Sequence, residues 1–264
     1  MAGSLHLTLS LLASSSEMEE ATAHWILSRL SGLGQLRRKL ARLEAAGSIR
    51  ISRGRLVDQR LVRLTDNARC RLLGGVDPEV EWSRCWDGVW RLVAFDIPES
   101  SRALRTRLRR RLREFRFGWL QNSVWISPHP VDAFRQRLGE TGLIPESLSY
   151  FAARPVGGGS HAALVKSAWD FSRLAEDYAA YREILRSRPG RISGTAARWF
   201  RWLDTEHLAW CRIARRDPFL PSELQPPDYP GQAAWAERRE ALDEFAQVVA
   251  AGIRAETLVP RPPA

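Results

Sequence analysis

The strongest constraint on the fold is a stretch in the middle of the chain where strand-like and helix-like segments alternate. Val89 to Phe95 is an apolar run, interrupted only by Arg91, that suits a buried strand. The segments after it read, in order, as an amphipathic helix, an extended segment, a second helix and a last strand, over residues 101–116, 119–127, 131–141 and 149–155. Two helices interleaved with strands predict a ferredoxin-like α+β domain over residues 85–156.

Residues 1–75 predict three helices followed by a short hairpin. Ser16 and Glu19 form a capping-box pattern that opens the second helix. The third helix carries a stripe of four leucines (residues 33, 36, 40 and 43), and Gly47 ends it. The hairpin strands are 49–51 and 61–64. This order is that of a winged helix-turn-helix domain.

The third helix and the hairpin are strongly basic. Residues 31–73 hold 11 basic and 3 acidic side chains. At about 100° per residue, the side opposite the leucines presents polar and cationic residues that suit base edges in the major groove. We expect the DNA-binding residues to be Gln35, Arg37, Arg38, Lys39 and Arg42 on this helix, with Arg53, Arg55 and Arg60 in the hairpin contacting phosphates or the minor groove. The alternatives are a merely solvated helix face and a winged helix that binds protein.

The third region begins after the linker at Val156 to Ser160. Helical stretches are predicted at residues 162–187, 194–216 and 232–255, and they are rich in tryptophan. They predict an all-α C-terminal domain over residues 161–258. The predicted fold class is therefore an α+β multidomain chain. Its aromatic residues Trp169, Tyr178 and Tyr181 are core side chains or, alternatively, the wall of a ligand pocket.

Charge narrows the range of partners. With 40 Lys and Arg against 30 Asp and Glu, the net charge is +10, which favours a polyanionic partner. Three scattered cysteines form neither a disulfide framework nor a metal-ligand spacing, which is typical of a reducing compartment such as the cytoplasm. The apolar start, Ser4 to Ala13, is interpreted as a first helix because no basic residue precedes it. We expect no metal, no cofactor and no membrane partner.

Separate sequence blocks resemble a known family. They are Trp86–Glu99, Arg102–Arg105, Phe117–Pro128, Asp217–Pro221 and Pro227–Gly231. Together they resemble the PaaX family of bacterial transcriptional regulators, typified by the repressor of phenylacetic acid degradation. The resemblance implies a winged helix, a central ferredoxin-like domain similar to small CRISPR-associated spacer-acquisition nucleases, and a helical C-terminal domain. Tyr229 stands where the family commonly has Trp.

The resemblance also implies a function. The expected protein is not an enzyme but a repressor that binds a double-stranded operator as a homodimer. An aryl- or acyl-CoA effector such as phenylacetyl-CoA would release it. Candidate effector-binding residues are Arg198, Trp199, Arg201, Trp202, Arg215 and Arg216. The alternatives are a metal-dependent nuclease using Asp96, and a winged-helix scaffold without DNA specificity.

One helix of the central domain has a charge that its own residues cannot balance. Residues 102–116 contain eight arginines and one acid, Glu114. Helical pairing at i,i+4 cannot neutralise them all. Solvent, DNA phosphates or a second subunit remain as their partners.

Overall fold

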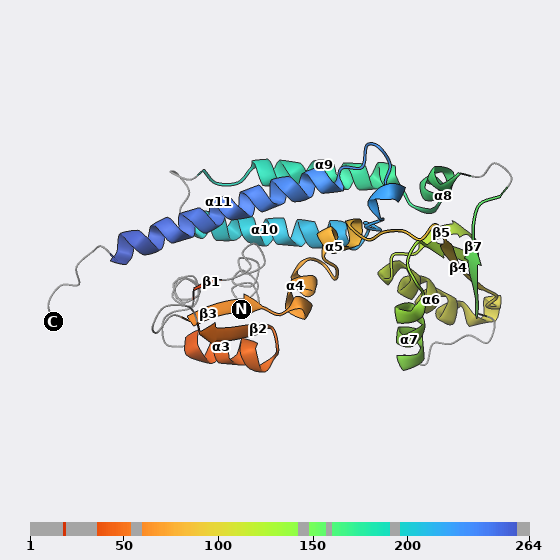
Figure 1. The fold of residues 1–264 in the computed structure, drawn as a ribbon, viewed down its shortest axis with the longest axis horizontal. Helices are drawn as coiled ribbons and strands as arrows, with labels where there is room; N and C mark the ends of the chain where they lie inside the picture. The colour runs from red at the N-terminus through yellow and green to blue at the C-terminus, as the bar shows by residue number, and fades with distance from the viewer. Residues whose placement is uncertain are drawn as a thin grey trace. The chain divides into compact units, whose positions relative to one another are not determined.

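The computed structural model describes residues 18–19, 36–53, 60–141, 148–156, 160–190 and 196–257 (Figure 1). The chain divides into two compact units. One comprises residues 1–75, 178–212 and 231–264, and the other comprises residues 76–177 and 213–230. In the described part of the chain, no helix is both long and apolar enough to cross a membrane.

The first unit contains a three-stranded antiparallel sheet of order β1-β3-β2. Its elements are β1 (Met18–Glu19), α3 (Leu36–Ala45), β2 (Ile49–Arg53), β3 (Arg60–Leu64) and α4 (Asp66–Leu72). Leu40 and Leu43 of α3 are buried, as are Ile49 and Val62 of the hairpin. Gly47 adopts a left-handed φ of 64°, and the Ser48 N–H donates to the Leu43 carbonyl at 2.8 Å, which closes the helix.

The capping-box prediction at Ser16 and Glu19 is wrong in one respect. Met18 and Glu19 form a strand that pairs with Val62 and Leu61 of β3, so Glu19 does not lie in the first turn of a helix. Met18 and Glu19 pair with an edge of β3 that β2 does not occupy, and this pairing takes the place of the predicted helical turn at Glu19. The first predicted helix and most of the second lie outside the described residues, so the winged helix-turn-helix stays a prediction.

The same unit contains most of three long helices. They are α9 (Phe171–Arg186), α10 (Ala196–Ala214) and α11 (Gly231–Thr257). The second and third confirm the helical stretches predicted at 194–216 and 232–255. Their core is aromatic: Trp199 stacks at a tilt on Phe245, and Tyr181 and Trp210 are buried. The all-α C-terminal domain and the three predicted domain boundaries stay predictions.

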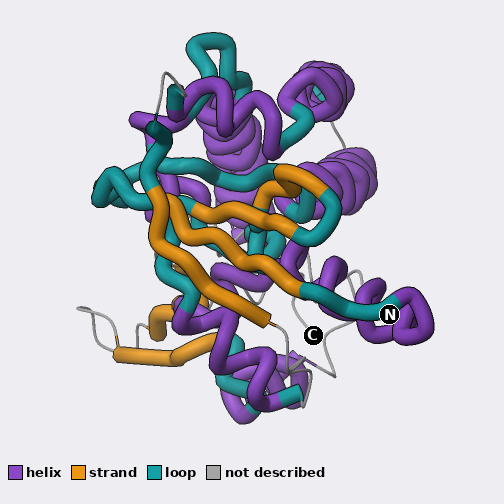
Figure 2. The backbone as a smooth tube through the Cα atoms, turned by 90° about the vertical axis from the view of Figure 1, so that its right-hand side faces the viewer, coloured by secondary structure: helices purple, strands orange, loops and turns teal. Residues whose placement is uncertain are grey.

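The second unit contains a four-stranded sheet of order β5-β6-β4-β7, whose strands lie side by side in Figure 2. Its elements are β4 (Trp90–Phe95), η2 (Glu99–Ser101), α6 (Arg102–Glu114), β5 (Gly118–Gln121), β6 (Val124–Ser127), α7 (Asp132–Glu140) and β7 (Leu148–Ala153). Every adjacent pair of strands is antiparallel. This order, with one helix after β4 and another after β6, confirms the ferredoxin-like prediction. Val93, Trp125, Leu108, Leu112 and Phe134 form the core between the sheet and the two helices.

Three segments differ from the sequence prediction. Residues 119–127 form a hairpin, because Asn122 turns the chain with a φ of 24°. Residues 162–187 form two helices, α8 (His161–Ala168) and α9. The break occurs because Trp169 is extended and the Asp170 carboxylate accepts the Arg173 N–H at 2.9 Å. Residues 76–84, which separate the first two predicted domains, contain the short helix α5 (Pro78–Trp82), which Asp77 caps.

The other face of this sheet packs against α8 and the loop around η3 (Ser222–Leu224). Trp90 and Ile126 of the sheet contact Val165, Leu220 and Leu224 there. Gly118 makes this close approach possible. A Cβ at this position would lie 2.6 Å from the Ala168 Cβ and 2.7 Å from a ring carbon of Trp169.

We therefore expect Gly118→Ala to lower the free energy of unfolding by about 1–3 kcal/mol, because the added methyl overpacks a close contact. Gly139→Ala is the matched control, since nothing lies within 4 Å of its Cβ position inside α7. There alanine is the better helix former and should raise stability by up to about 1 kcal/mol. Urea unfolding of both variants checks the opposite signs. A Gly118 variant as stable as the parent would contradict the close packing.

Candidate nucleic-acid interface and binding groove

The described part of α3 presents one of the predicted DNA-binding side chains on its outer side. Arg42 is exposed, whereas Leu40 and Leu43 are buried. The predicted residues Arg37, Arg38 and Lys39 lie in the helical backbone of α3. Gln35 lies outside the described residues. The Glu44 carboxylate accepts the Ile51 N–H at 3.3 Å and so ties α3 to the hairpin.

The hairpin adds two pairs of facing arginines. Arg53 lies opposite Arg60, and Arg50 lies opposite Arg63. Arg50, Arg53 and Arg63 are exposed. Arg55 lies outside the described residues.

Arg50 and Arg63 are candidates that the sequence analysis missed. Successive side chains of a strand alternate between its faces, so the buried Ile49 and Val62 turn Arg50 and Arg63 outward. The pattern Ile49-Arg50-Ile51 already contained this signal. Two exposed guanidinium groups opposite each other suit a phosphate between them.

The candidate effector residues are divided between the two units, and Arg198, Arg201 and Trp202 line one open pocket of the first unit. Trp199 is fully buried against Trp202 and Phe245. Arg198 and Arg201 are exposed on α10, in the first unit. Arg215 and Arg216 belong to the second unit, where Arg216 pairs with Asp177 at 2.7 Å. A role for these residues in effector binding stays a prediction.

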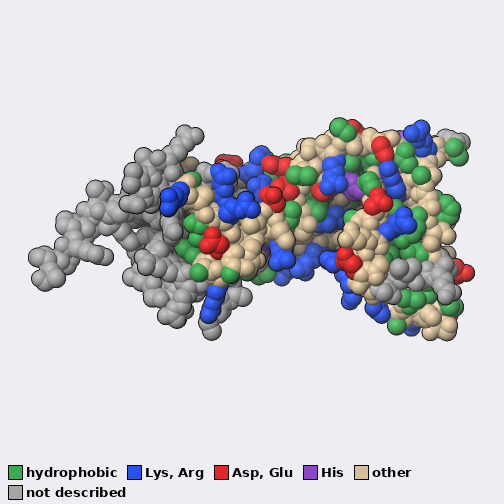
Figure 3. Space-filling model, turned by 60° about the horizontal axis from the view of Figure 1, so that its bottom comes forward, with side chains coloured by type: hydrophobic (Ala, Val, Ile, Leu, Met, Phe, Trp, Pro, Cys, Tyr) green, Lys and Arg blue, Asp and Glu red, His purple; other side chains and the backbone are tan. Residues whose placement is uncertain are grey.

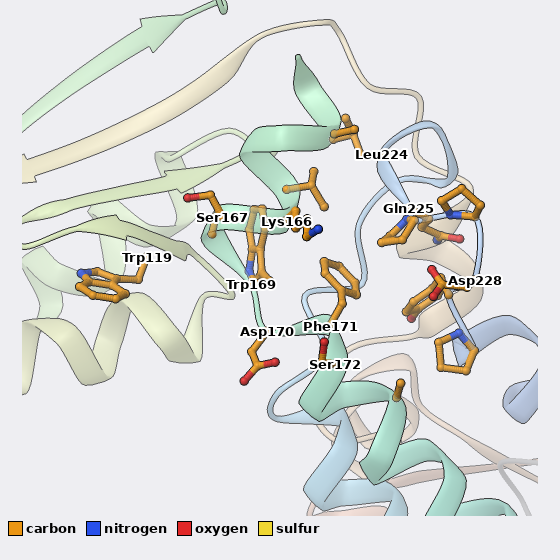
Figure 4. Close-up of a pocket in the computed structure, with 18 of the residues that line it drawn as sticks. Trp119, Lys166, Ser167, Trp169, Asp170, Phe171, Ser172, Leu224, Gln225 and Asp228 are labelled. Atoms are coloured by element: carbon orange, nitrogen blue, oxygen red, sulfur yellow. The ribbon is translucent and has the colours of Figure 1, made fainter. Parts of the chain in front are cut away.

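The second unit contains a large groove of about 1070 Å³. It lies between α8, the start of α9, β5 and the proline-rich loop 224–230. Trp169 and Phe171 stand near its centre, and Gln225 and Asp228 come from the loop (Figure 4). Trp119 of β5 also lines the groove and lies apart from these residues. Trp119 is 51% exposed, so a large aromatic surface faces solvent here. Such a surface suits an apolar or aromatic ligand.

A smaller cavity of about 270 Å³ shares Trp119, Trp169 and Phe171 with this groove. Its wall is cationic, with Arg113, Arg116, Arg173, Arg215 and Arg216. Two acids, Asp170 and Asp177, also line it. The combined groove therefore has an aromatic end and an arginine-rich end, although only Arg215 and Arg216 of the predicted effector residues line it.

The loop that borders the groove is held by a buried carboxylate. Asp217 accepts the Phe219 N–H and the Tyr229 hydroxyl, each at 2.7 Å. These bonds hold Phe219 at the unusual φ of 45°. They also join the two C-terminal sequence blocks, and Tyr229 supplies the donor.

Arg116 connects this loop to the ferredoxin-like domain. Its guanidinium donates to the Ala214 carbonyl at 3.1 Å and lies 5.4 Å from the centre of the Phe219 ring. Burial lowers the pKa of Arg116, while the nearby Asp217 and Glu81 carboxylates act in the opposite direction. Its backbone is left-handed, with a φ of 60°, at the end of α6.

Asp96, the carboxylate considered for metal-dependent cleavage, is exposed directly after β4. Among the residues that the structure describes, no three or more His, Cys, Asp and Glu side chains are grouped to hold a metal ion.

The strand order and helix positions define residues 83–165 as a ferredoxin-like α+β domain of the Cas2 type. These residues match the PaaX protein central Cas2-like domain. The sequence blocks from Trp86 to Pro128, which resemble the PaaX family, lie within this matched region. The fold also resembles the uncharacterized protein Rv0674 from Mycobacterium tuberculosis, with a TM-score of 0.58 and 21% sequence identity. That match covers 93% of this chain and 95% of the other. None of the curated proteins matches the chain.

Proposed function

We propose that the chain is a DNA-binding transcriptional regulator of the PaaX type, acting in the cytoplasm as a repressor of aromatic-acid catabolism such as that of phenylacetic acid. The observation that carries this proposal is the basic surface of α3 and its hairpin. Arg42, Arg50, Arg53 and Arg63 are exposed there, and the buried Leu40 and Leu43 anchor the helix. The match of residues 83–165 to the PaaX central domain supports the same class of function.

In this proposal α3 reads base edges in the major groove, and the hairpin arginines bind phosphates. A homodimer places one α3 in each half-site, about 34 Å apart or a multiple of that distance. The predicted residues Gln35, Arg38 and Arg42 supply the base contacts. Arg53, Arg55 and Arg60, together with Arg50 and Arg63, supply the backbone contacts.

The effector belongs to the same proposal. The groove at Trp119 and Trp169 is wide enough for an aryl group, and its arginine-rich end suits the phosphates of an aryl- or acyl-CoA thioester. A ligand bound there favours one conformation over another and shifts the population away from the DNA-bound state. The observation that favours this site over the α10 residues is the complete burial of Trp199.

The test starts from duplexes selected from a random pool by the full chain and examined by mobility shift. We expect a selected duplex to bind at least 1,000-fold more tightly than a scrambled one at physiological salt. Phenylacetyl-CoA should release the selected duplex and raise the melting temperature of the protein. If selection enriches no sequence, the regulator proposal fails.

Two variants at exposed aromatic residues test whether the effector binds in this groove. Trp119→Ala should weaken both effects of phenylacetyl-CoA, because Trp119 lines the groove. Phe151→Ala is the matched control, since Phe151 is 55% exposed on β7 and does not line the groove. Equal responses of the two variants would place the effector elsewhere.

A further inference from the structure

The outer face of α6 carries more positive charge than the surrounding residues balance. Arg105 pairs with Glu99 at 2.6 Å, and Arg111 pairs with Glu114 at 2.6 Å. Arg110 lies 3.6 Å from the same Glu114 carboxylate, which is therefore shared. Arg109 bonds the Asn122 carbonyl and Arg113 lies over the Trp125 ring, contacts that leave the charge of each guanidinium in place. Seven arginines (residues 102, 105, 107, 109, 110, 111 and 113) thus face two paired acids.

Several exposed arginines elsewhere in the described part of the chain have an acid of their own. Arg84 pairs with Glu81, Arg137 with Glu140 and Arg186 with Glu183, each at i,i+3. On α7, within the same domain, Asp132 and Glu140 offset Arg135 and Arg137. The excess on α6 is therefore a property of that helix and does not follow from the arginine-rich composition alone. Figure 3 shows a face of the molecule on which lysine and arginine side chains gather.

The outward side of α6 carries exposed cations among small side chains. Leu108 and Leu112 are fully buried, which fixes the inner side of the helix. At about 100° per residue, Arg110 lies directly opposite them, between the small residues Ala103 and Thr106, and all three are exposed. Three more exposed arginines flank this side, with Arg102 and Arg113 on one edge and Arg107 on the other.

We propose that this outer face of α6 binds the phosphodiester backbone of duplex DNA, as a contact that is independent of sequence and separate from α3. The small residues Ala103 and Thr106 let a strand approach the helix, and the exposed guanidinium groups around them bond its phosphates. From residue 102 to residue 113 the helix rises about 17 Å. That length corresponds to about five base-pair steps along the duplex axis at 3.4 Å each.

Charge argues for DNA over a second copy of the chain. Each copy has a net charge of +10, so a copy is a poor partner for an arginine surface. The inference rests on the proposed function in one respect, namely that DNA is the partner. The alternative partner for this face is an acidic protein. In that case substitutions on α6 would leave the affinity for DNA unchanged.

The test compares two triple variants of the full chain on one random-sequence 40-base-pair duplex. One variant is Arg102→Gln, Arg107→Gln and Arg110→Gln on α6. The other is Arg84→Gln, Arg137→Gln and Arg186→Gln, which removes the same charge from exposed sites that have their own acids. Binding constants are measured between 50 and 200 mM salt, and thermal melts check that both variants fold.

We expect the α6 variant to lower the salt slope by about 2.7, because each lost phosphate contact removes about 0.9. The affinity advantage of the wild type then shrinks by about 40-fold between 50 and 200 mM salt. The control variant should keep the wild-type slope. Equal slopes for the two variants would overturn the α6 contact. If the α6 variant fails to fold, the single variant Arg107→Gln is used, with an expected decrease of about 0.9 in slope.

The result of the α6 test can be distinguished from the result of the test of the regulator proposal. Loss of preference for a selected duplex concerns α3, whereas the slope on a random duplex concerns α6. If the wild-type chain enriches no sequence but the α6 variant has a lower salt slope than the control variant, the regulator proposal is rejected and the α6 contact is kept. A wild-type chain that does not bind the random duplex at all would overturn both.

Discussion

Glu206→Gln is expected to lower the free energy of unfolding by about 3–5 kcal/mol, because it leaves a buried guanidinium without its counter-charge. Glu206 is 0% exposed and Arg238 is 3% exposed. The Arg238 Nε donates to Glu206 at 2.7 Å, and the Tyr181 hydroxyl donates to the same carboxylate oxygen at 2.6 Å. Burial raises the pKa of Tyr181 well above its usual value, so the phenol stays protonated and keeps donating.

Arg238 cannot swing out to solvent to relieve the loss. Its guanidinium carbon lies 5.0 Å from the centre of the Trp210 ring and 5.4 Å from that of Trp235. Trp210 is itself fixed, since its indole N–H donates to the Leu73 carbonyl at 3.1 Å. The charge must therefore remain in an aromatic cage of low polarity, where an unpaired ion is costly.

Glu237→Gln, next to Arg238 on α11, is the matched control for this prediction. Glu237 pairs with Arg182, but both side chains are about one-third exposed. We expect a loss of at most about 1 kcal/mol there. The double variant Glu206→Leu, Arg238→Met should recover most of the stability, since it removes both charges. Denaturant unfolding measures all three, and a Glu206 variant no less stable than the Glu237 variant would contradict the buried pair.

The second large effect concerns DNA. Arg38→Ala with Arg42→Ala should abolish the preference for a selected duplex. Each base-reading arginine contributes about 1–3 kcal/mol of discrimination, so the pair contributes about 2–6 kcal/mol. Binding to a random duplex should fall much less, because the phosphate contacts remain. Mobility shifts on a selected and a scrambled duplex measure the ratio.

Arg50→Ala with Arg63→Ala is the control for this prediction, since it removes the same number of charges from the outer face of the hairpin. It should weaken binding to both duplexes alike and lower the salt slope by about 2. If the α3 variant kept its preference while the hairpin variant lost it, the hairpin would be the reading element.

Periodicity predicted the ferredoxin-like domain well, because its helices bury one face each. Leucines at 104, 108 and 112 mark the inner side of α6, and Val93 and Phe95 mark the inner side of β4. The same reasoning failed at Asn122 and Trp169, where single residues break an otherwise continuous pattern. Asn122 adopts a positive φ and Asp170 caps a new helix. The spacing of hydrophobic residues indicates neither the turn nor the new helix start.

The groove was less predictable than the basic surface. Periodicity identified Trp169 as apolar but could not distinguish a core residue from a wall of a cavity. Trp199 is likewise an aromatic residue of a predicted helix, yet it is fully buried. Arg215 and Arg216 are predicted from their charge, but three more arginines of the cavity come from elsewhere: Arg113 from α6, Arg116 from just after it, and Arg173 from α9.

The sequence by itself determined the strand-helix alternation, the leucine-backed basic helix and the family blocks, because each depends on residues close together in the chain. Tertiary structure decided which residues meet across long separations. It joined Asp217 to Tyr229, Arg116 to Ala214 and Glu206 to Arg238. It also made Gly118 the point where α8 touches the sheet. Such contacts depend on how whole helices and sheets pack, and no local spacing in the chain contains that information.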